Sequence, residues 1–207
     1  MKKILFLVVC ALGFICAQDA PMRVACIGDS VTMGYGLANA KEDAYPSQLG
    51  RLLGENYLIK TFGELGTTVV TEDYSHICHS PEFPRMLEFA PDVITICLGS
   101  YDSKDRYRST AKFFERDYIA LIENIKEVLP DAKIIVMSPP KYHLKGEDDY
   151  LATNIIPILK KVAGQYNLQF VDVYPIFEND DKELLSYGVH PTAKGAGLIA
   201  RELVKYF

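Results

Sequence analysis

The sequence has few cysteines and no long apolar segment after its N-terminal run, and both absences narrow the class of protein. Five cysteines occur in 207 residues, too sparse a set for the disulfide framework of a small secreted scaffold. Two of them lie in the first 16 residues, which leaves Cys26, Cys78 and Cys97. No later apolar run is long enough to span a bilayer. We therefore expect packing of an apolar core to stabilise the fold.

The sequence also lacks a basic cluster. Its formal net charge is −5, and it becomes −7 if a leader with Lys2 and Lys3 is removed, because that segment holds no acid. An acidic protein does not suit nucleic acid or anionic lipid, whose phosphates bind Lys and Arg. No glycine-rich phosphate loop follows the first predicted strand, which argues against a flavodoxin-like nucleotide binder. We expect no nucleic acid, no stable membrane span, no metal and no organic cofactor.

The first 17 residues have the organisation of a secretory signal peptide. Two lysines precede an apolar run from Ile4 to Cys16, and Ala17 is a small residue before a polar stretch. We expect cleavage near Ala17 and export of residues 18–207 to the periplasm or the cell exterior. A lipid anchor on Cys10 or Cys16 is less favoured, because bulky residues precede both.

Apolar runs alternate with helical patterns along the rest of the chain. Strands are predicted over residues 24–27, 57–62, 93–98, 133–137 and 169–173. Helices are predicted over residues 46–53, 84–89, 110–129, 151–166 and 193–206, with a polar loop over 141–149. The strands are apolar throughout, which indicates burial on both faces and a parallel sheet. The pattern predicts a three-layer α/β/α sandwich with a central, mostly parallel five-stranded sheet, in one domain over residues 18–207.

Ser30 is the first candidate for chemistry. The first predicted strand ends at Gly28 and is followed by Asp29 and Ser30. Ligands of open α/β sheets bind at the carboxyl ends of the strands, so a serine at this position is placed for nucleophilic attack. The alternative interpretation is a serine that caps a helix.

His190 is the best candidate for the base that a nucleophilic serine needs. It lies in a turn-rich loop just before the last predicted helix, at the same edge of the sheet as Ser30. An exposed histidine in a helix-capping loop is the alternative. His76 and His79 could bind a metal, but no helical pattern points both inward, and a polar surface loop is favoured.

Four short blocks resemble the GDSL/SGNH hydrolase family in their residues and order. They are Gly28-Asp29-Ser30, Gly66, Gly99 after an apolar strand, and His190-Pro191 before the last helix. The similarity extends over residues 24–207 and is greatest to exported esterases and carbohydrate O-acetylesterases. The resemblance implies the flavodoxin-like fold of that family, Ser30 as nucleophile and His190 as general base. It also implies that the backbone N–H groups of Ser30 and Gly66 form an oxyanion hole.

Two positions depart from the family pattern. The third block usually reads Gly-x-Asn-Asp, with the asparagine as an oxyanion donor, and here Tyr101 stands in its place. The last block usually reads Asp-x-x-His, with the aspartate orienting the histidine, and here Tyr187 stands in its place. Either tyrosine hydroxyl could take over part of the lost role. A replacement acid also remains open: Asp29, Asp102, Asp180, Asp181 or Glu183.

These residues favour an exported serine esterase that hydrolyses carboxylic esters, with O-acetyl groups on carbohydrate as the expected substrate. We expect Asp29, Tyr101 and Tyr187 to contact the substrate, because aromatic faces and hydroxyls suit sugar rings. The alternative is a catalytically impaired relative that binds glycan without efficient hydrolysis. Loss of the orienting acid and of one oxyanion donor favours this alternative.

Overall fold

The computed structural model describes residues 20–72, 74–141, 144–178 and 183–207, so the predicted signal peptide lies outside it. Its centre is a five-stranded sheet in the order β2-β1-β3-β4-β5, in which every neighbouring pair is parallel. The strands are β1 (Met22–Gly28), β2 (Tyr57–Gly63), β3 (Val93–Cys97), β4 (Lys133–Met137) and β5 (Gln169–Val171). The predicted parallel sheet is confirmed.

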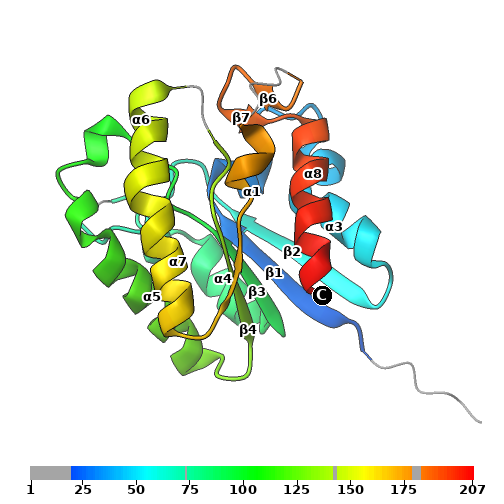
Figure 1. Cartoon of the computed structure of the whole chain (residues 1–207). Helices are drawn as coiled ribbons and strands as arrows, with labels where there is room; N and C mark the ends of the chain where they lie inside the picture. The colour runs from blue at the N-terminus through cyan, green and yellow to red at the C-terminus, as the bar shows by residue number, and fades with distance from the viewer. Residues whose placement is uncertain (1–19, 73, 142–143, 179–182) are drawn as a thin grey trace, which may run out of the picture.

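Helices cover both faces of this sheet (Figure 1), which confirms the three-layer sandwich. One face carries α4 (Glu82–Phe89), α5 (Phe114–Val128) and α7 (Ile156–Gln165), and the other carries α3 (Tyr45–Leu53) and α8 (Ala193–Leu203). Successive side chains of a strand point to opposite faces. Ala25 and Ile27 of β1 therefore join the first core, and Val24 and Cys26 join the second.

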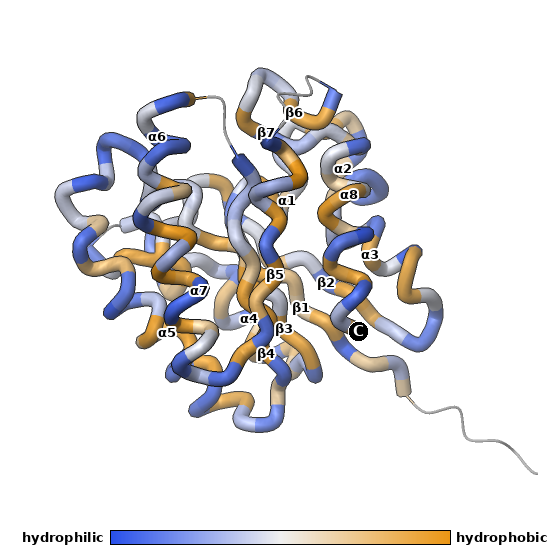
Figure 2. The backbone as a smooth tube through the Cα atoms, in the orientation of Figure 1, coloured by the Kyte–Doolittle hydropathy of each residue, from blue (hydrophilic) through white to orange (hydrophobic). Residues whose placement is uncertain are grey.

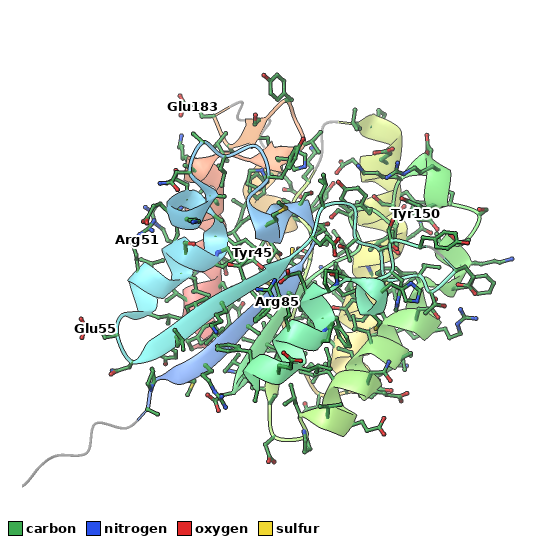
Figure 3. The ribbon with its side chains drawn as sticks, turned by 180° about the vertical axis from the view of Figure 1, so that it is seen from behind. Tyr45, Arg51, Glu55, Arg85, Tyr150 and Glu183 are labelled. Atoms are coloured by element: carbon green, nitrogen blue, oxygen red, sulfur yellow. The ribbon has the colours of Figure 1, made fainter. Side chains whose placement is uncertain are left out.

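β2 departs from the expectation of a strand buried on both faces. It lies at an edge of the sheet, where Leu58 is 42% exposed while Phe62 is 4% exposed. Figure 2 shows apolar residues concentrated along the central strands, and Figure 3 shows Arg51 and Glu55 pointing away from the body of the protein. Within the described residues, every helix is too short or too polar to cross a bilayer.

The prediction of a polar loop over residues 141–149 is wrong for the second half of that segment. α6 (Lys145–Tyr150) begins there and continues through a π-helical segment, Leu151–Ile155, into α7. Acids in the first turn, Glu147 and Asp148, favour a helix N-terminus. Asp148 is also buried and accepts a hydrogen bond from the Tyr174 hydroxyl at 2.9 Å. That tertiary contact has no signal in local sequence.

Several boundaries also differ from the predicted ones. Two helices are shorter than predicted, because one end of each predicted helix forms a 3-10 turn instead. The turn Ala111–Phe113 precedes α5, and the turn Val204–Tyr206 follows α8. β5 ends at Val171, two residues earlier than predicted, and a further 3-10 turn, Tyr174–Phe177, follows it. A short 3-10 turn also forms at Ile77–His79, and another at Asp105–Tyr107. None of these differences changes the order of the layers.

Small elements at the carboxyl end of the sheet were not predicted. α1 (Ser30–Met33) follows β1 directly, α2 (Ala40–Asp43) precedes α3, and a hairpin of β6 (Leu185–Ser186) and β7 (His190–Pro191) precedes α8. Figure 1 shows α1 and this hairpin at the same end of the molecule, where they are in contact. Residues 160 positions apart in the chain are thereby brought together.

We predict that Gly28→Ala destabilises the fold, because Gly28 ends β1 at a point of close backbone approach. A Cβ at this position would lie 2.7 Å from the carbonyl oxygen of Cys97 on β3 and against the Thr32 side chain. Backbone cannot move aside as the end of a flexible side chain does. We expect the free energy of unfolding in urea to fall by about 2–3 kcal/mol, the upper range for overpacking.

Gly164→Ala is the matched control for this variant. The same change is made in α7, where the added Cβ meets nothing within 4 Å. Alanine in a helix interior is more favourable than glycine by about 0.5–1 kcal/mol, so this variant should be slightly more stable than the parent. Equal effects of the two substitutions would contradict the tight strand-to-helix turn.

Candidate active site

Ser30 is the first residue of α1 and is held there by the buried side chain of Asp29. The Val31 N–H donates to Asp29 Oδ1 at 2.8 Å, and the Ser100 hydroxyl donates to Asp29 Oδ2. Burial raises the pKa of the Asp29 carboxyl to about 6. Both carboxylate oxygens are engaged, so Asp29 lies beneath the pocket in this structure and does not line it. The hydrogen bond from Ser100 had no signal in the sequence.

His190 is the first residue of β7, and its Nε2 lies 3.2 Å from Ser30 Oγ. The hairpin of β6 and β7 sets this position through a three-residue loop, residues 187–189, in which Tyr187 has φ 50° and Gly188 has φ 69°. The Val189 N–H donates to the Ser186 carbonyl across the turn at 3.1 Å. Two successive positive φ angles are typical of the type I′ turn, whose twist matches that of the paired strands.

The surroundings of His190 keep its imidazole neutral. Burial lowers the pKa of His190, and the positive charge of Lys104 lowers it further. The ring of Tyr35 packs against the imidazole with the ring centroids 5.0 Å apart. A neutral imidazole is the form that accepts a proton as a general base.

The predicted orienting partners of His190 lie elsewhere in the structure. Among the described residues, His190 Nδ1 has no hydrogen-bond acceptor, and Tyr187 is fully exposed. Glu183 forms an ion pair with Lys194 at 2.5 Å and lies at the outer margin of the molecule in Figure 3. Of the other acids considered, Asp180 and Asp181 lie outside the described residues.

Asp102, which was also considered as a replacement acid for His190, fixes the loop that carries Gly66. Its Oδ1 accepts hydrogen bonds from the Val69 N–H at 3.0 Å and the Val70 N–H at 3.1 Å. The carboxyl is fully buried, and burial raises its pKa to about 7. Gly66 itself has φ 91°, a conformation that favours glycine. Within the described part of the chain, its N–H donates no hydrogen bond, so it is free for a ligand.

Tyr101 contacts both candidate oxyanion residues. The Ser30 side chain is near enough to its hydroxyl to lower the pKa of Tyr101. A Cβ on Gly66 would lie 3.9 Å from the Tyr101 ring carbon Cε1. Burial raises the pKa of Tyr101 and the interaction with Ser30 opposes this, so the hydroxyl keeps its proton at neutral pH and can donate it.

Two pockets lie at this edge of the sheet. The smaller is a shallow hollow with a cavity volume of about 10 Å³, and it is lined by Ser30, Val31, Ser100, Tyr101, Lys104, Val189 and His190. The larger has a cavity volume of about 190 Å³ and is lined by Glu64, Leu65, Thr67, Tyr74, Ser75, His76, His79 and Ser80.

Lys104 was not singled out from the sequence, although it comes only two residues after Asp102, the last residue of the third block.

His76 accepts a hydrogen bond from the Cys78 N–H through Nδ1 at 3.2 Å. In the described part of the chain, no group of three or more His, Cys, Asp or Glu residues could hold a metal.

Ser30 and His190 thus lie within hydrogen-bonding distance of each other at the carboxyl edge of a parallel α/β/α sheet. The GDSL-like lipase/acylhydrolase family is matched over residues 26–198, and the chain belongs to this family of carboxylic ester hydrolases. An acetylxylan esterase of Xylanibacter ruminicola is 32% identical over 208 aligned positions. The alignment covers 88% of this chain but 42% of that protein, so the chain spans less than half of its length.

Solved structures share the fold. A carbohydrate acetylesterase family member from Sinorhizobium meliloti superimposes with a TM-score of 0.71 at 23% identity, covering 89% of this chain and 96% of that one. The aryl esterase of M. smegmatis also gives a TM-score of 0.71, at 18% identity, covering 89% of this chain and 97% of that one.

The two buried carboxyls predict that stability falls as the pH rises from about 4 to about 7. The pKa of Asp29 rises from 3.8 to about 6 and that of Asp102 to about 7. Folding therefore favours the protonated forms, and their stabilisation is complete below pH 4 and lost as the pH passes the raised values. Each group contributes at most about 1.4 kcal/mol per pH unit. Asp102→Asn should flatten this dependence in urea unfolding across that range.

Asp92→Asn is the control for that variant. Asp92 also accepts a hydrogen bond from a backbone N–H, that of Arg23 at 2.7 Å, but at an exposed position. We expect its pH dependence to follow that of the parent. An Asp102→Asn curve parallel to the parent curve would show that Asp102 is ionised in the folded protein throughout, against the prediction.

Proposed function

We propose that this protein is an exported esterase that removes O-acetyl groups from carbohydrate. The observation that carries the proposal is the approach of His190 Nε2 to Ser30 Oγ at 3.2 Å. Membership of the GDSL-like family supports ester chemistry. Similarity to proteins named as an acetylxylan esterase and a carbohydrate acetylesterase family member supports an acetylated carbohydrate as substrate. The basic and apolar pattern of residues 1–17 supports export.

The reaction follows from the serine–histidine pair. Ser30 Oγ attacks the ester carbonyl carbon while His190 Nε2 takes the hydroxyl proton. The tetrahedral intermediate collapses, the bond to the alcohol oxygen breaks, and His190 returns the proton to the leaving alcohol. Water then attacks the acetyl-Ser30 ester with His190 again as base, which releases acetate and restores Ser30. Protein groups and water supply every step.

Backbone N–H groups stabilise the oxyanion in this scheme. Ser30 is the first residue of α1, where the N–H has no partner within the helix. The Gly66 N–H is the second donor, on the loop that Asp102 fixes. The Tyr101 hydroxyl is a third donor in place of the asparagine of the family pattern. One such donor accelerates the reaction by about 10²–10³-fold in a serine protease.

Among the residues that the structure describes, no acid contacts His190, and this limits the rate. In the serine-protease triad, loss of the orienting aspartate lowers kcat by about 10⁴-fold. A neutral tyrosine cannot stabilise an imidazolium as a carboxylate does, and Tyr187 is in any case exposed. We therefore expect slow turnover, with activated esters as the best substrates.

The same feature favours a second candidate function, glycan binding without efficient hydrolysis. Tyr101 and Tyr187 stand where the family pattern has an asparagine and an aspartate, the two side chains that stabilise charge during the reaction. Both offer aromatic faces and hydroxyls, which suit sugar rings. Tyr187 is fully exposed beside the hairpin that carries His190, so its ring is available to a bound glycan.

Ser30→Ala should reduce hydrolysis of p-nitrophenyl acetate by the purified chain to the background rate, because the variant has no nucleophile. The comparison is valid if parent and variant unfold at the same urea concentration. Activity that survives the substitution would remove Ser30 from the mechanism. His190→Asn should lower kcat by about 10²-fold, because loss of the orienting acid alone already costs about 10⁴-fold of the roughly 10⁶-fold that a whole triad supplies.

Tyr187→Asp should raise kcat on the same substrate by at least about 10-fold, a fraction of the effect of an orienting carboxylate. Aspartate tolerates a positive φ better than tyrosine, so the turn should accept it. Tyr187→Asn is the control, because it has the same shape and turn preference without the charge. An equal gain in both variants would attribute the effect to the turn. If the parent does not hydrolyse p-nitrophenyl acetate and Tyr187→Asp does, the result would favour the second candidate function.

A further inference from the structure

Lys104 places a positive charge in the catalytic pocket. It lines the same pocket as Ser30 and His190 and is half-buried. Its Nζ lies 4.1 Å from the centroid of the Tyr101 ring. Among the described residues it forms no ion pair. Partial burial of an ammonium without an acidic partner is costly, and an anion that enters the pocket recovers that cost.

Neighbouring acids offset only part of the charge of this ammonium. Burial lowers the pKa of Lys104; Glu147 on α6 and the buried Asp29 raise it in part, and Arg106 lowers it. Glu147 forms no ion pair with Lys104 in the described structure, and Asp29 is engaged by Val31 and Ser100. Arg106, two residues along the chain, adds a second cation on this side of the pocket.

The lining of the pocket and the chemistry of the acetyl group together indicate which part of a substrate meets Lys104. Val189 and His190 share this lining, whereas Gly66, the second oxyanion donor, does not. His190 delivers the proton to the leaving alcohol, so the alcohol oxygen lies on the His190 side of Ser30. Ser30 and Tyr101 line this pocket as well, so the lining alone does not divide the alcohol side from the acyl side. The acyl group of the proposed substrate is acetyl, which carries no charge, so an anionic group that meets Lys104 belongs to the alcohol.

The site also has an electrostatic mismatch that an anion would correct. His190 must become an imidazolium during the reaction, and among the described residues no carboxylate contacts its Nδ1. The charge of Lys104 opposes imidazolium formation, as its effect on the pKa of His190 indicates. A carboxylate bound to Lys104 would offset that charge at the step where the imidazolium forms.

We propose that the alcohol portion of the substrate carries a carboxylate, as in an O-acetylated uronic acid, and that Lys104 binds it. This inference rests on the proposed ester hydrolysis and narrows its substrate class. It makes Lys104 a specificity-determining residue and places an acidic sugar at the mouth of the small pocket.

The test compares two esters that differ in one group. Methyl mono-O-acetyl-glucuronide and the corresponding methyl mono-O-acetyl-glucoside differ at C6, which is a carboxylate in the first and a hydroxymethyl group in the second. We expect kcat/KM to be at least about 10-fold higher for the glucuronide, the range of a charge-assisted hydrogen bond. Lys104→Met should bring this ratio close to one, and Lys104→Arg should keep most of it.

Lys112→Met is the matched control variant. Lys112 also lies over an aromatic ring, with its Nζ 4.9 Å from the Phe113 centroid, but it is exposed and does not line the pocket. Its ratio should equal that of the parent. A hemisuccinate ester of the neutral glucoside places the carboxylate on the acyl side. A preference for this ester that depends on Lys104 would overturn the assignment to the alcohol side.

A binding measurement separates this inference from the proposed function. Calorimetry with the Ser30→Ala chain compares methyl glucuronide with methyl glucoside, and tighter binding of the glucuronide should disappear when Lys104→Met is added. Such binding without hydrolysis of any ester would overturn the proposed esterase but retain the role of Lys104. Ser30-dependent hydrolysis with equal kcat/KM for the two esters would overturn the role of Lys104 and retain the esterase. No hydrolysis and equal binding would overturn both.

Discussion

The hydrogen bonds that the buried Asp29 carboxylate accepts are the constraint on which the site depends. One fixes the first turn of α1 and the other reaches Ser100 after β3, so two loops at the carboxyl edge of the sheet share one anchor. Asp102 does the same for the loop of Gly66. Buried carboxyls are costly, and their raised pKa values express that cost. The hydrogen bonds of these two carboxyls hold three loops in a fixed arrangement: the loop after β1, the loop after β3 and the loop of Gly66.

The central fold could be predicted because its signal is local. Apolar runs such as Val93–Cys97 are continuous in sequence, and only a strand buried on both faces needs them. α6 could not be predicted, because its polar residues form a helix in contact with Tyr174 from a distant segment. The edge strand β2 was misjudged for a related reason, since position in a sheet is decided by neighbours and not by the strand itself.

The sequence predicted the two central residues of the site but not the orientation of their neighbours. Ser30 and His190 stand in short motifs, and the parallel topology brings their ends of the chain together. The motif could not indicate that Asp29 faces inward or that the turn leaves Tyr187 exposed. Lys104 escaped notice because a lysine in a polar loop is most often solvated. Only the fold of residues 99–107 around Tyr101 brings its ammonium group over the ring.

The type I′ turn at Tyr187 and Gly188 has a consequence for how the sequence can change. A tyrosine codon becomes an aspartate codon by a single base substitution, and the positive φ of residue 187 suits aspartate better than tyrosine. The aspartate that the resemblance to the family leads us to expect at this position is thus one base substitution away. An exchange of tyrosine for aspartate at residue 187 would therefore relieve the conflict between side chain and backbone that the positive φ creates.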